Sequence, residues 1–218
     1  MGVSIVGITK FHFLKLNGKL LLGFFVSILF ACAPETHRDQ AGADREIFFD
    51  GLKDLCGQSF QGRLVSNDAV DADFAKAQLI MHVRDCTPDT VRIPFHVDDN
   101  RSRTWVITKS DRGLKLEHDH RHKDGEPDAV TLYGGDTIDG WESSETGKLA
   151  GRQVFPVNQY SKDLFIREGL DGSVTNIWSL ELKPGEIFAY ELRRTDRHFR
   201  VEFDLSKPVA TPPPAWGY

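Results

Sequence analysis

The sequence is short of the residues from which several common sites are built. Its 218 residues include three cysteines, none of them spaced as C-x-x-C, and no G-x-S-x-G, P-loop or H-E-x-x-H motif. Neither a cysteine-rich zinc site nor the common hydrolase and nucleotide-binding signatures are therefore predicted. Basic residues are also in deficit, with 27 lysines and arginines against 32 aspartates and glutamates. We predict no nucleic-acid partner, because phosphate binding needs a basic surface.

The first 31 residues differ from the rest in having an uninterrupted apolar run. Lys10, Lys15 and Lys19 precede the run at residues 20–31, and no acidic residue occurs before it. The run is too short to span about 30 Å of hydrocarbon, but it fits the apolar region of an export signal. We predict that residues 1–31 are a signal peptide.

The apolar run ends in Leu29-Phe30-Ala31-Cys32. This tetrapeptide resembles the lipobox of bacterial lipoproteins: Leu29 and Ala31 match the usual pattern, and Phe30 is larger than the usual residue. The resemblance implies that Cys32 carries the lipid and anchors the protein in the membrane of the cell envelope. Ala33, which is not an aspartate, implies sorting to the periplasmic face of the outer membrane. An ordinary cleaved signal with an unrelated cysteine is the alternative.

Two cysteines remain once Cys32 is set aside. Cys56 and Cys86 form an even pair in an exported chain, and disulfides persist in oxidising compartments. We predict a Cys56–Cys86 disulfide, which would stabilise the fold by roughly 3–4 kcal/mol in the chain-entropy model. Two buried thiols are the alternative.

The exported part divides into a tether, one domain and a tail. Residues 32–43 are polar and small, as in a flexible tether. Asp44 is a suitable N-cap for a short helix through Leu55, in which apolar residues recur at helical spacing. This helix opens a single domain predicted over residues 44–206. Residues 207–218 are rich in proline and are expected to form a loose, extended tail.

Apolar residues recur with period two from Ser59 onward, which is typical of strands with one buried face. The pattern predicts strands near residues 60–64, 77–83, 91–97, 102–110, 113–122, 129–133, 153–157, 176–182, 187–193 and 199–205. We predict a mainly β fold, an antiparallel meander closed as a barrel of about 8–10 strands. In strand pattern alone it is similar to lipocalins and fatty-acid-binding proteins, whose strands surround a cavity. The short motifs that mark lipocalins are not evident, and a β-sandwich is the alternative.

Three features interrupt the strand pattern. Pro94 removes a backbone donor, so its strand is expected to have an edge or a bulge there. The sequence Tyr133-Gly134-Gly135-Asp136 favours a turn. Farther on, Ser161 is a possible N-cap for a short helix that ends near residue 169.

The most specific chemical feature is a row of histidines that follows a strand from Gly113 onward. Leu114, Leu116, His118, His120 and His122 share one face of an extended strand, and the leucines indicate that this face points inward. The preceding strand places Trp105 inward as well. A four-residue connection, residues 110–113, then pairs Trp105 with His118 across the hairpin.

Three interpretations of this row stay open. In the first, Trp105, His118, His120 and His122 line a cavity that binds a small molecule, or a haem with a histidine as axial ligand. In the second, His118 and His120 bind zinc or copper with ligands from elsewhere, which would make the protein a metal-binding protein or a metal-dependent enzyme. Side chains two apart on a strand are about 6.8 Å apart, so two imidazoles can share an ion but three cannot.

In the third interpretation the row runs past the barrel rim, and the half-solvated histidines face polar groups on neighbouring strands. A structural envelope lipoprotein with protein partners is a further alternative for the function. No nucleophile is paired with a base in the sequence, so a non-enzymatic role is favoured and a hydrolase assembled from distant residues stays open. Of these functions, we predict ligand binding inside the barrel.

Overall fold

The structure is a computed structural model that describes residues 35–137 and 151–218. The predicted signal peptide and Cys32 lie outside these ranges. Within them the chain is mainly β, as predicted, with two α-helices, α1 (Glu35–Lys53) and α2 (Gln159–Arg167). Neither of these helices is long and apolar enough to cross a membrane.

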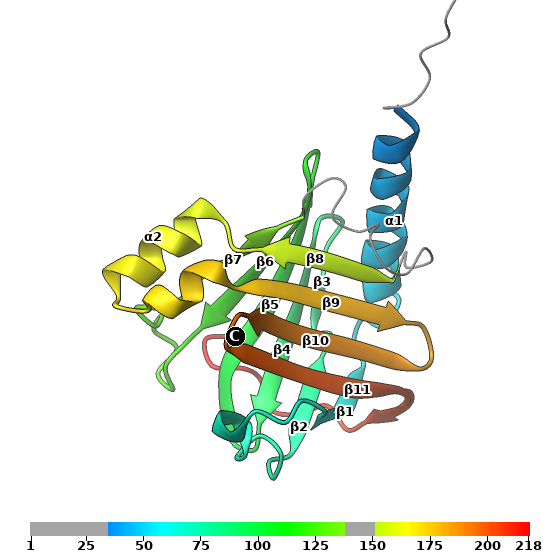
Figure 1. Cartoon of the computed structure of the whole chain (residues 1–218). Coiled ribbons are helices and arrows are strands. Elements are labelled where there is room, and N and C mark those ends of the chain that lie inside the picture. Colours follow the sequence, from blue (N-terminus) through cyan, green and yellow to red (C-terminus); the bar gives the residue numbers. More distant parts are fainter. Residues whose placement is uncertain (1–34, 138–150) are drawn as a thin grey trace, which may run out of the picture. The chain divides into compact units, whose positions relative to one another are not determined.

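Ten antiparallel strands form a nearly closed barrel, which confirms the predicted architecture. Around the barrel the order is β7-β6-β5-β4-β2-β1-β11-β10-β9-β8, with the short β3 paired to β4. In Figure 1, β8 to β11 pass in front of β4, β5 and β6 and cross them at a steep angle. The strands are β1 (Ser59–Leu64), β2 (Leu79–His82), β3 (Asp85–Cys86), β4 (Thr90–Val97), β5 (Asn100–Ser110), β6 (Gly113–His120), β7 (Tyr133–Asp136), β8 (Arg152–Pro156), β9 (Ile177–Lys183), β10 (Ile187–Arg194) and β11 (Arg197–Val209).

Closure of the barrel depends on two glycines that were expected to form a turn. Gly134 and Gly135 lie in β7, which pairs with β6; Gly135 also forms a bridge with Val157, the residue that follows β8. A Cβ on Gly134 would lie 1.7 Å from the Leu116 carbonyl oxygen, and one on Gly135 would lie 2.2 Å from the Pro156 oxygen. Glycine is therefore required here for close approach of two backbones. The predicted strand at residues 129–133 is wrong, since only Tyr133 belongs to a strand.

Alternation along the strands fills the barrel with apolar side chains. In β11, Val201 and Phe203 are fully buried, whereas Arg200 and Glu202 between and beside them are partly exposed. Pro94 of β4 lies between the residues paired with β3 and those paired with β2, so its missing N–H leaves no strand unpaired. The register of β4 with β5 shifts just after it, between Phe95 and Val97.

Helix α1 begins at Glu35, well before the predicted N-cap at Asp44, so the segment predicted as a flexible tether is helical from there. No proline follows Pro34 in this segment, and most of its residues are tolerated in helices. The apolar residues Phe48, Phe49 and Leu52 of α1 are buried in the core, as expected. The helix packs against β6, β8 and β9, near the end of the barrel where the β5–β6 hairpin turns.

The predicted disulfide is confirmed. Cys56, in the turn after α1, is bonded to Cys86 of β3 with a Cα–Cα distance of 6.3 Å. The bond fixes the C-terminal end of α1 to the barrel wall.

Helix α2 begins earlier than predicted. Its N-cap is Asn158, whose side-chain oxygen accepts hydrogen bonds from the backbone N–H and hydroxyl of Ser161. The Ser161 hydroxyl oxygen in turn accepts a hydrogen bond from the backbone N–H of Gly134, at 2.7 Å. This contact attaches α2 to β7. A short 3₁₀ turn, η2 (Asp171–Thr175), follows, and another, η1 (Ala69–Asp71), precedes β2.

The C-terminal segment is not the loose tail that the sequence suggested. Strand β11 extends to Val209, and residues 210–218 fold back along the outside of the barrel. The Arg101 side chain donates to the Pro214 carbonyl at 2.9 Å, and the Tyr218 hydroxyl donates to Asp119 at 2.6 Å. The sequence of the tail does not predict these contacts, because Arg101 and Asp119 each lie about one hundred residues before their partners in the tail.

Candidate functional site

The β5–β6 hairpin has the predicted register. Trp105 lies opposite His118, Arg103 lies opposite His120, and the hairpin turns between Ser110 and Gly113. Gly113 has φ +124°, a conformation that other residues rarely adopt. The inward face of the hairpin therefore changes from leucine near the turn to imidazole and guanidinium at the far end.

The third histidine does not continue this face. Strand β6 ends at His120, and the side chain of His122 is 57% exposed, 3.7 Å from a carboxylate oxygen of Asp128. A tight turn at residues 122–125 redirects the chain, since the Gly125 N–H donates to the His122 carbonyl. His122 is therefore outside the set of inward residues into which the sequence had placed it.

His118 is a buried, neutral imidazole with both nitrogens occupied. Its Nδ1 lies 3.1 Å from the Tyr133 carbonyl oxygen, which accepts only, so Nδ1 carries the proton. Its Nε2, 2.9 Å from the Tyr190 hydroxyl, must then accept. Burial is the main cause that lowers the pKa of His118 to about 3. The ring also stacks on Tyr133, with a centroid distance of 4.7 Å.

His120 lies nearer the barrel rim and forms a hydrogen bond with the side chain of Tyr133. Its Nε2 is 3.2 Å from the Tyr133 hydroxyl. Burial, followed by the positive charge of Arg103, lowers the pKa of His120 to about 4. Burial likewise raises the pKa of Tyr133 to about 12. Both groups are therefore neutral around pH 7.

These side chains surround a cavity of about 140 Å³ at the end of the barrel away from the β5–β6 turn. Trp105, stacked between Phe95 and Tyr190 at centroid distances of 4.9 and 4.6 Å, forms one wall. The lining contains aromatic rings, two imidazoles and two guanidinium groups, and none of the described lining residues is an aspartate or glutamate: Phe74, Phe95, Arg103, Thr104, Trp105, His118, His120, Tyr133, Tyr190, Leu192, Arg197 and Phe199.

The two arginines of this cavity differ in their partners. Arg197 is paired with Asp68 at 3.1 Å and, more closely, with Asp71. Arg103 forms no ion pair with any carboxylate of the described ranges; its contacts are Ser102 Oγ at 3.5 Å and the ring of Phe74, 5.9 Å from the guanidinium carbon. Burial lowers the pKa of Arg103, although an arginine stays charged at any physiological pH.

The described residues do not assemble a metal site. No group of three or more histidine, cysteine, aspartate or glutamate side chains is placed to hold an ion in residues 35–137 and 151–218. Both nitrogens of His118 are already in hydrogen bonds. The cavity also does not fit a haem, because about 140 Å³ is below the roughly 300–1,000 Å³ usual for pockets of larger organic ligands.

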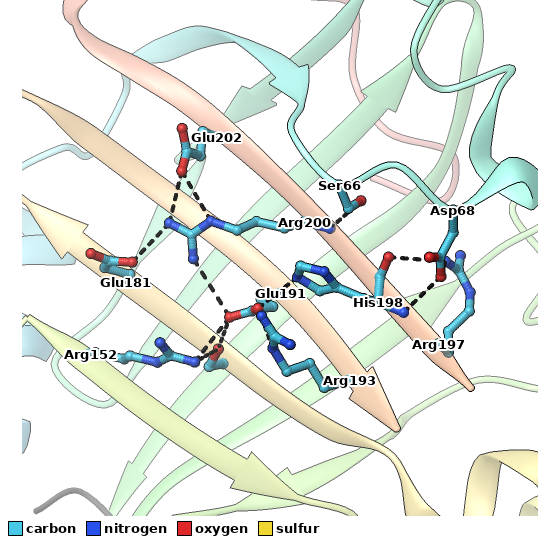
Figure 2. A network of polar contacts seen from close by, with 11 residues as sticks. Ser66, Asp68, Arg152, Glu181, Glu191, Arg193, Arg197, His198, Arg200 and Glu202 are labelled. Carbon is cyan, nitrogen blue, oxygen red and sulfur yellow. Dashed lines mark hydrogen bonds and ion pairs between the residues drawn. The ribbon is translucent and has the colours of Figure 1, made fainter. Parts of the chain in front are cut away.

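A second network of charges lies on the outer face of β8 to β11 and includes Arg197 of the cavity wall (Figure 2). At its centre is Glu191, whose side chain is only 3% exposed. Arg152 at 2.9 Å, Arg193 at 2.6 Å and His198 at 2.9 Å contact its two oxygens, and Arg200 lies 3.6 Å away. Burial raises the pKa of Glu191, but the surrounding arginines outweigh it and the net shift is downward. Every charge at its centre is paired, which is typical of a structural network.

Sequence reasoning found part of the cavity. Trp105, His118 and His120 all line it, as the inward row predicts. Arg103 was missed, although it has the same parity as Trp105 on its strand and the pattern could have placed it inside. Tyr133 and Tyr190 were missed as members of the site because strand pairing across the closed barrel brings them to the histidines. Comparisons with protein-family models, curated proteins and solved structures give no match for this chain.

Proposed function

We propose that this chain is an exported, lipid-anchored protein of the bacterial cell envelope whose barrel binds a small organic ligand. The observation that carries the binding role is the cavity of about 140 Å³ that Trp105, His118 and His120 line at one end of the barrel. Binding sites are typically apolar cavities with a few placed polar groups, and this cavity has that composition.

The size of the cavity limits the ligand. An apolar cavity of roughly 150 Å³ is large enough to hold one benzene ring. The aromatic walls formed by Phe95, Trp105 and Phe199 suit a flat or branched apolar body of that size. A compact ligand of about one ring is therefore favoured over a lipid chain or a large cofactor.

Retention of a ligand through purification tests the binding role. The protein is purified from its native envelope and extracted, and bound small molecules are identified by mass spectrometry. Leu192→Phe adds a ring to a residue of the cavity wall and is expected to abolish the ligand signal. Ile166→Phe adds a similar ring to a side chain that is 59% exposed on α2, and it should retain the signal. Equal recovery of every compound from both variants would refute binding in this cavity.

The anchor rests on the lipobox-like sequence that ends in Cys32. Metabolic labelling with a radioactive fatty acid should mark the wild-type protein, and Cys32→Ser should abolish the label. Fractionation of inner and outer membranes on a density gradient tests the proposed outer-membrane location. Labelling of the Cys32→Ser variant at the wild-type level would contradict the proposed anchor.

A further inference from the structure

We infer that the ligand of the barrel cavity is a small organic monoanion, most simply a carboxylate of about one ring, whose charge pairs with Arg103. This inference rests on the proposed binding function and specifies the chemical class of its ligand. The charges and the hydrogen-bond donors around the cavity support it.

The positive charge of Arg103 is not balanced by a carboxylate of the described residues. Arg103 points into the cavity from β5, on the same inward face as Trp105, and is half-buried without a carboxylate partner in the described ranges. Partly desolvated cations are costly unless an anion or hydrogen-bond acceptors compensate them. Arg197, which borders the same cavity, shows the usual solution, since Asp68 and Asp71 neutralise it. A bound anion would give Arg103 the corresponding partner.

A hydrogen-bond donor without an acceptor among the described residues lies beside Arg103. His120 and the Tyr133 hydroxyl share one hydrogen bond, at 3.2 Å, and together carry two hydrogens on polar atoms. If the hydroxyl donates to Nε2, the His120 Nδ1–H is left over; if Nε2–H donates, the hydroxyl hydrogen is left over. In either tautomer one donor stays available, because none of the described residues accepts a hydrogen bond from it. Guanidinium and this donor together suit the two oxygens of a carboxylate.

The charge of the cavity indicates how much charge the ligand carries. Arg197 is paired with Asp68 and Asp71, whereas Arg103 has no carboxylate partner within residues 35–137 and 151–218, so the cavity would compensate one negative charge on a ligand. A phosphate dianion would bring a second charge into a space walled by Phe95, Trp105 and Phe199, where desolvation is costly. The balance therefore favours a monoanion with an apolar body. Arginine binds carboxylates through two parallel N–H donors, which also fixes the orientation of the ligand.

Benzoate and benzamide form a matched pair of probes that differ in charge and fit the estimated size. Binding of each to the purified full-length protein is measured by isothermal titration calorimetry at pH 7 and low salt. We expect benzoate to bind at least 10-fold more tightly than benzamide. Arg103→Gln should remove this preference while leaving weak benzamide binding intact. Arg63→Gln removes an arginine whose side chain is 78% exposed on β1 and should leave the preference unchanged.

The outcomes separate this inference from the function on which it rests. Equal affinity for benzoate and benzamide, with Leu192→Phe blocking both, would overturn the anionic class and leave small-ligand binding supported. A benzoate preference that survives Arg103→Gln would overturn the role of Arg103. Failure of both probes would overturn the inference as stated, and the extraction experiment then judges the proposed function alone. Circular dichroism of each variant confirms that the barrel is folded.

Discussion

Arg103 and His120 lie directly opposite each other on β5 and β6, and both side chains line the same cavity. When two basic groups lie this close, protonation of one disfavours protonation of the other. Arginine keeps its proton because its pKa is far higher than that of histidine. The positive charge of Arg103 contributes to the lowered pKa of His120, about 4. Among the described residues, the far end of the barrel interior thus carries the unpaired positive charge of Arg103 beside the neutral imidazole of His120.

Replacement of Arg103 is expected to stabilise the ligand-free protein. Arg103→Met removes a half-buried charge without a carboxylate partner and keeps an apolar stem, so the free energy of unfolding should rise by about 0.5–2 kcal/mol. Urea titration followed by tryptophan fluorescence measures the change. Arg197→Met is the control: it leaves the buried Asp71 without its main partner and should lower the free energy of unfolding by roughly 2–4 kcal/mol. A lower free energy of unfolding in Arg103→Met would contradict this prediction, because it would mean that the charge of Arg103 is compensated in the ligand-free protein.

Stability should fall as the pH is lowered, because His118 is neutral when folded. Its pKa is about 3 in the fold and near 6.5 in the unfolded chain, so the unfolded state binds more protons between these values. The stability from the neutral imidazole is present above about pH 6.5 and is lost as the pH falls toward 3. At pH 5 the loss for this group is about 2 kcal/mol.

The pH dependence of chemical unfolding between pH 7 and 5 measures this effect. His118→Gln has no titrating group and should show a shallower slope than the wild-type protein, although it is less stable at pH 7. His122→Gln serves as the control, because it removes a histidine whose side chain is 57% exposed. An unchanged slope in His118→Gln would contradict the buried neutral state.

Glu191 should be the most sensitive member of the charge network in Figure 2. Glu191→Gln leaves Arg152, Arg193 and Arg200 facing one another without their shared carboxylate, and the free energy of unfolding is expected to fall by roughly 2–4 kcal/mol. Thermal and urea unfolding measure it. Glu186→Gln, at an exposed position in the turn between β9 and β10, should change the free energy by less than about 0.5 kcal/mol. Equal effects of the two substitutions would refute a central role for Glu191.

Gly134→Ala should open the barrel or unfold it. The added methyl group would collide with the Leu116 carbonyl oxygen, so the free energy of unfolding should fall by about 3 kcal/mol or more. Gly42→Ala is the matched control: a methyl group there meets no atom within 4 Å in the described residues, and alanine favours the helix by about 0.5–1 kcal/mol. Urea unfolding measures the change in the free energy of unfolding for both variants. Hydrogen exchange of the β7 amides distinguishes an opened barrel from an unfolded protein.

The fold was predictable where local pattern and burial agree. Alternation placed Trp105 and His118 on one inward face, and hydrophobic parity fixed their pairing in the hairpin. The same argument failed beyond His120, because a turn ended the strand while the histidine pattern continued. The glycines at 134 and 135 were read as a turn since their local sequence is typical of one; their role in closure depends on strands far away in the chain.

The candidate site was predictable only on the hairpin that carries it. Its other walls come from strands and turns brought together by barrel closure, as with Tyr190 and Phe74. The distinction between Arg103 and Arg197 is likewise invisible in the sequence, because the partners of Arg197 lie more than one hundred residues earlier. Parity predicts which side chains point inward, and the closed barrel determines what they meet.

The disulfide between Cys56 and Cys86 also has a mechanical consequence. Tension applied along α1 passes to Cys56 in the turn after the helix, where the covalent bond carries it directly to β3 on the barrel wall. The intervening residues 57–85, which include β1 and β2, are then bypassed by the load. Under oxidising conditions a pull on α1 would be resisted first by β3 and its neighbour β4, and reduction would transfer that load to β1.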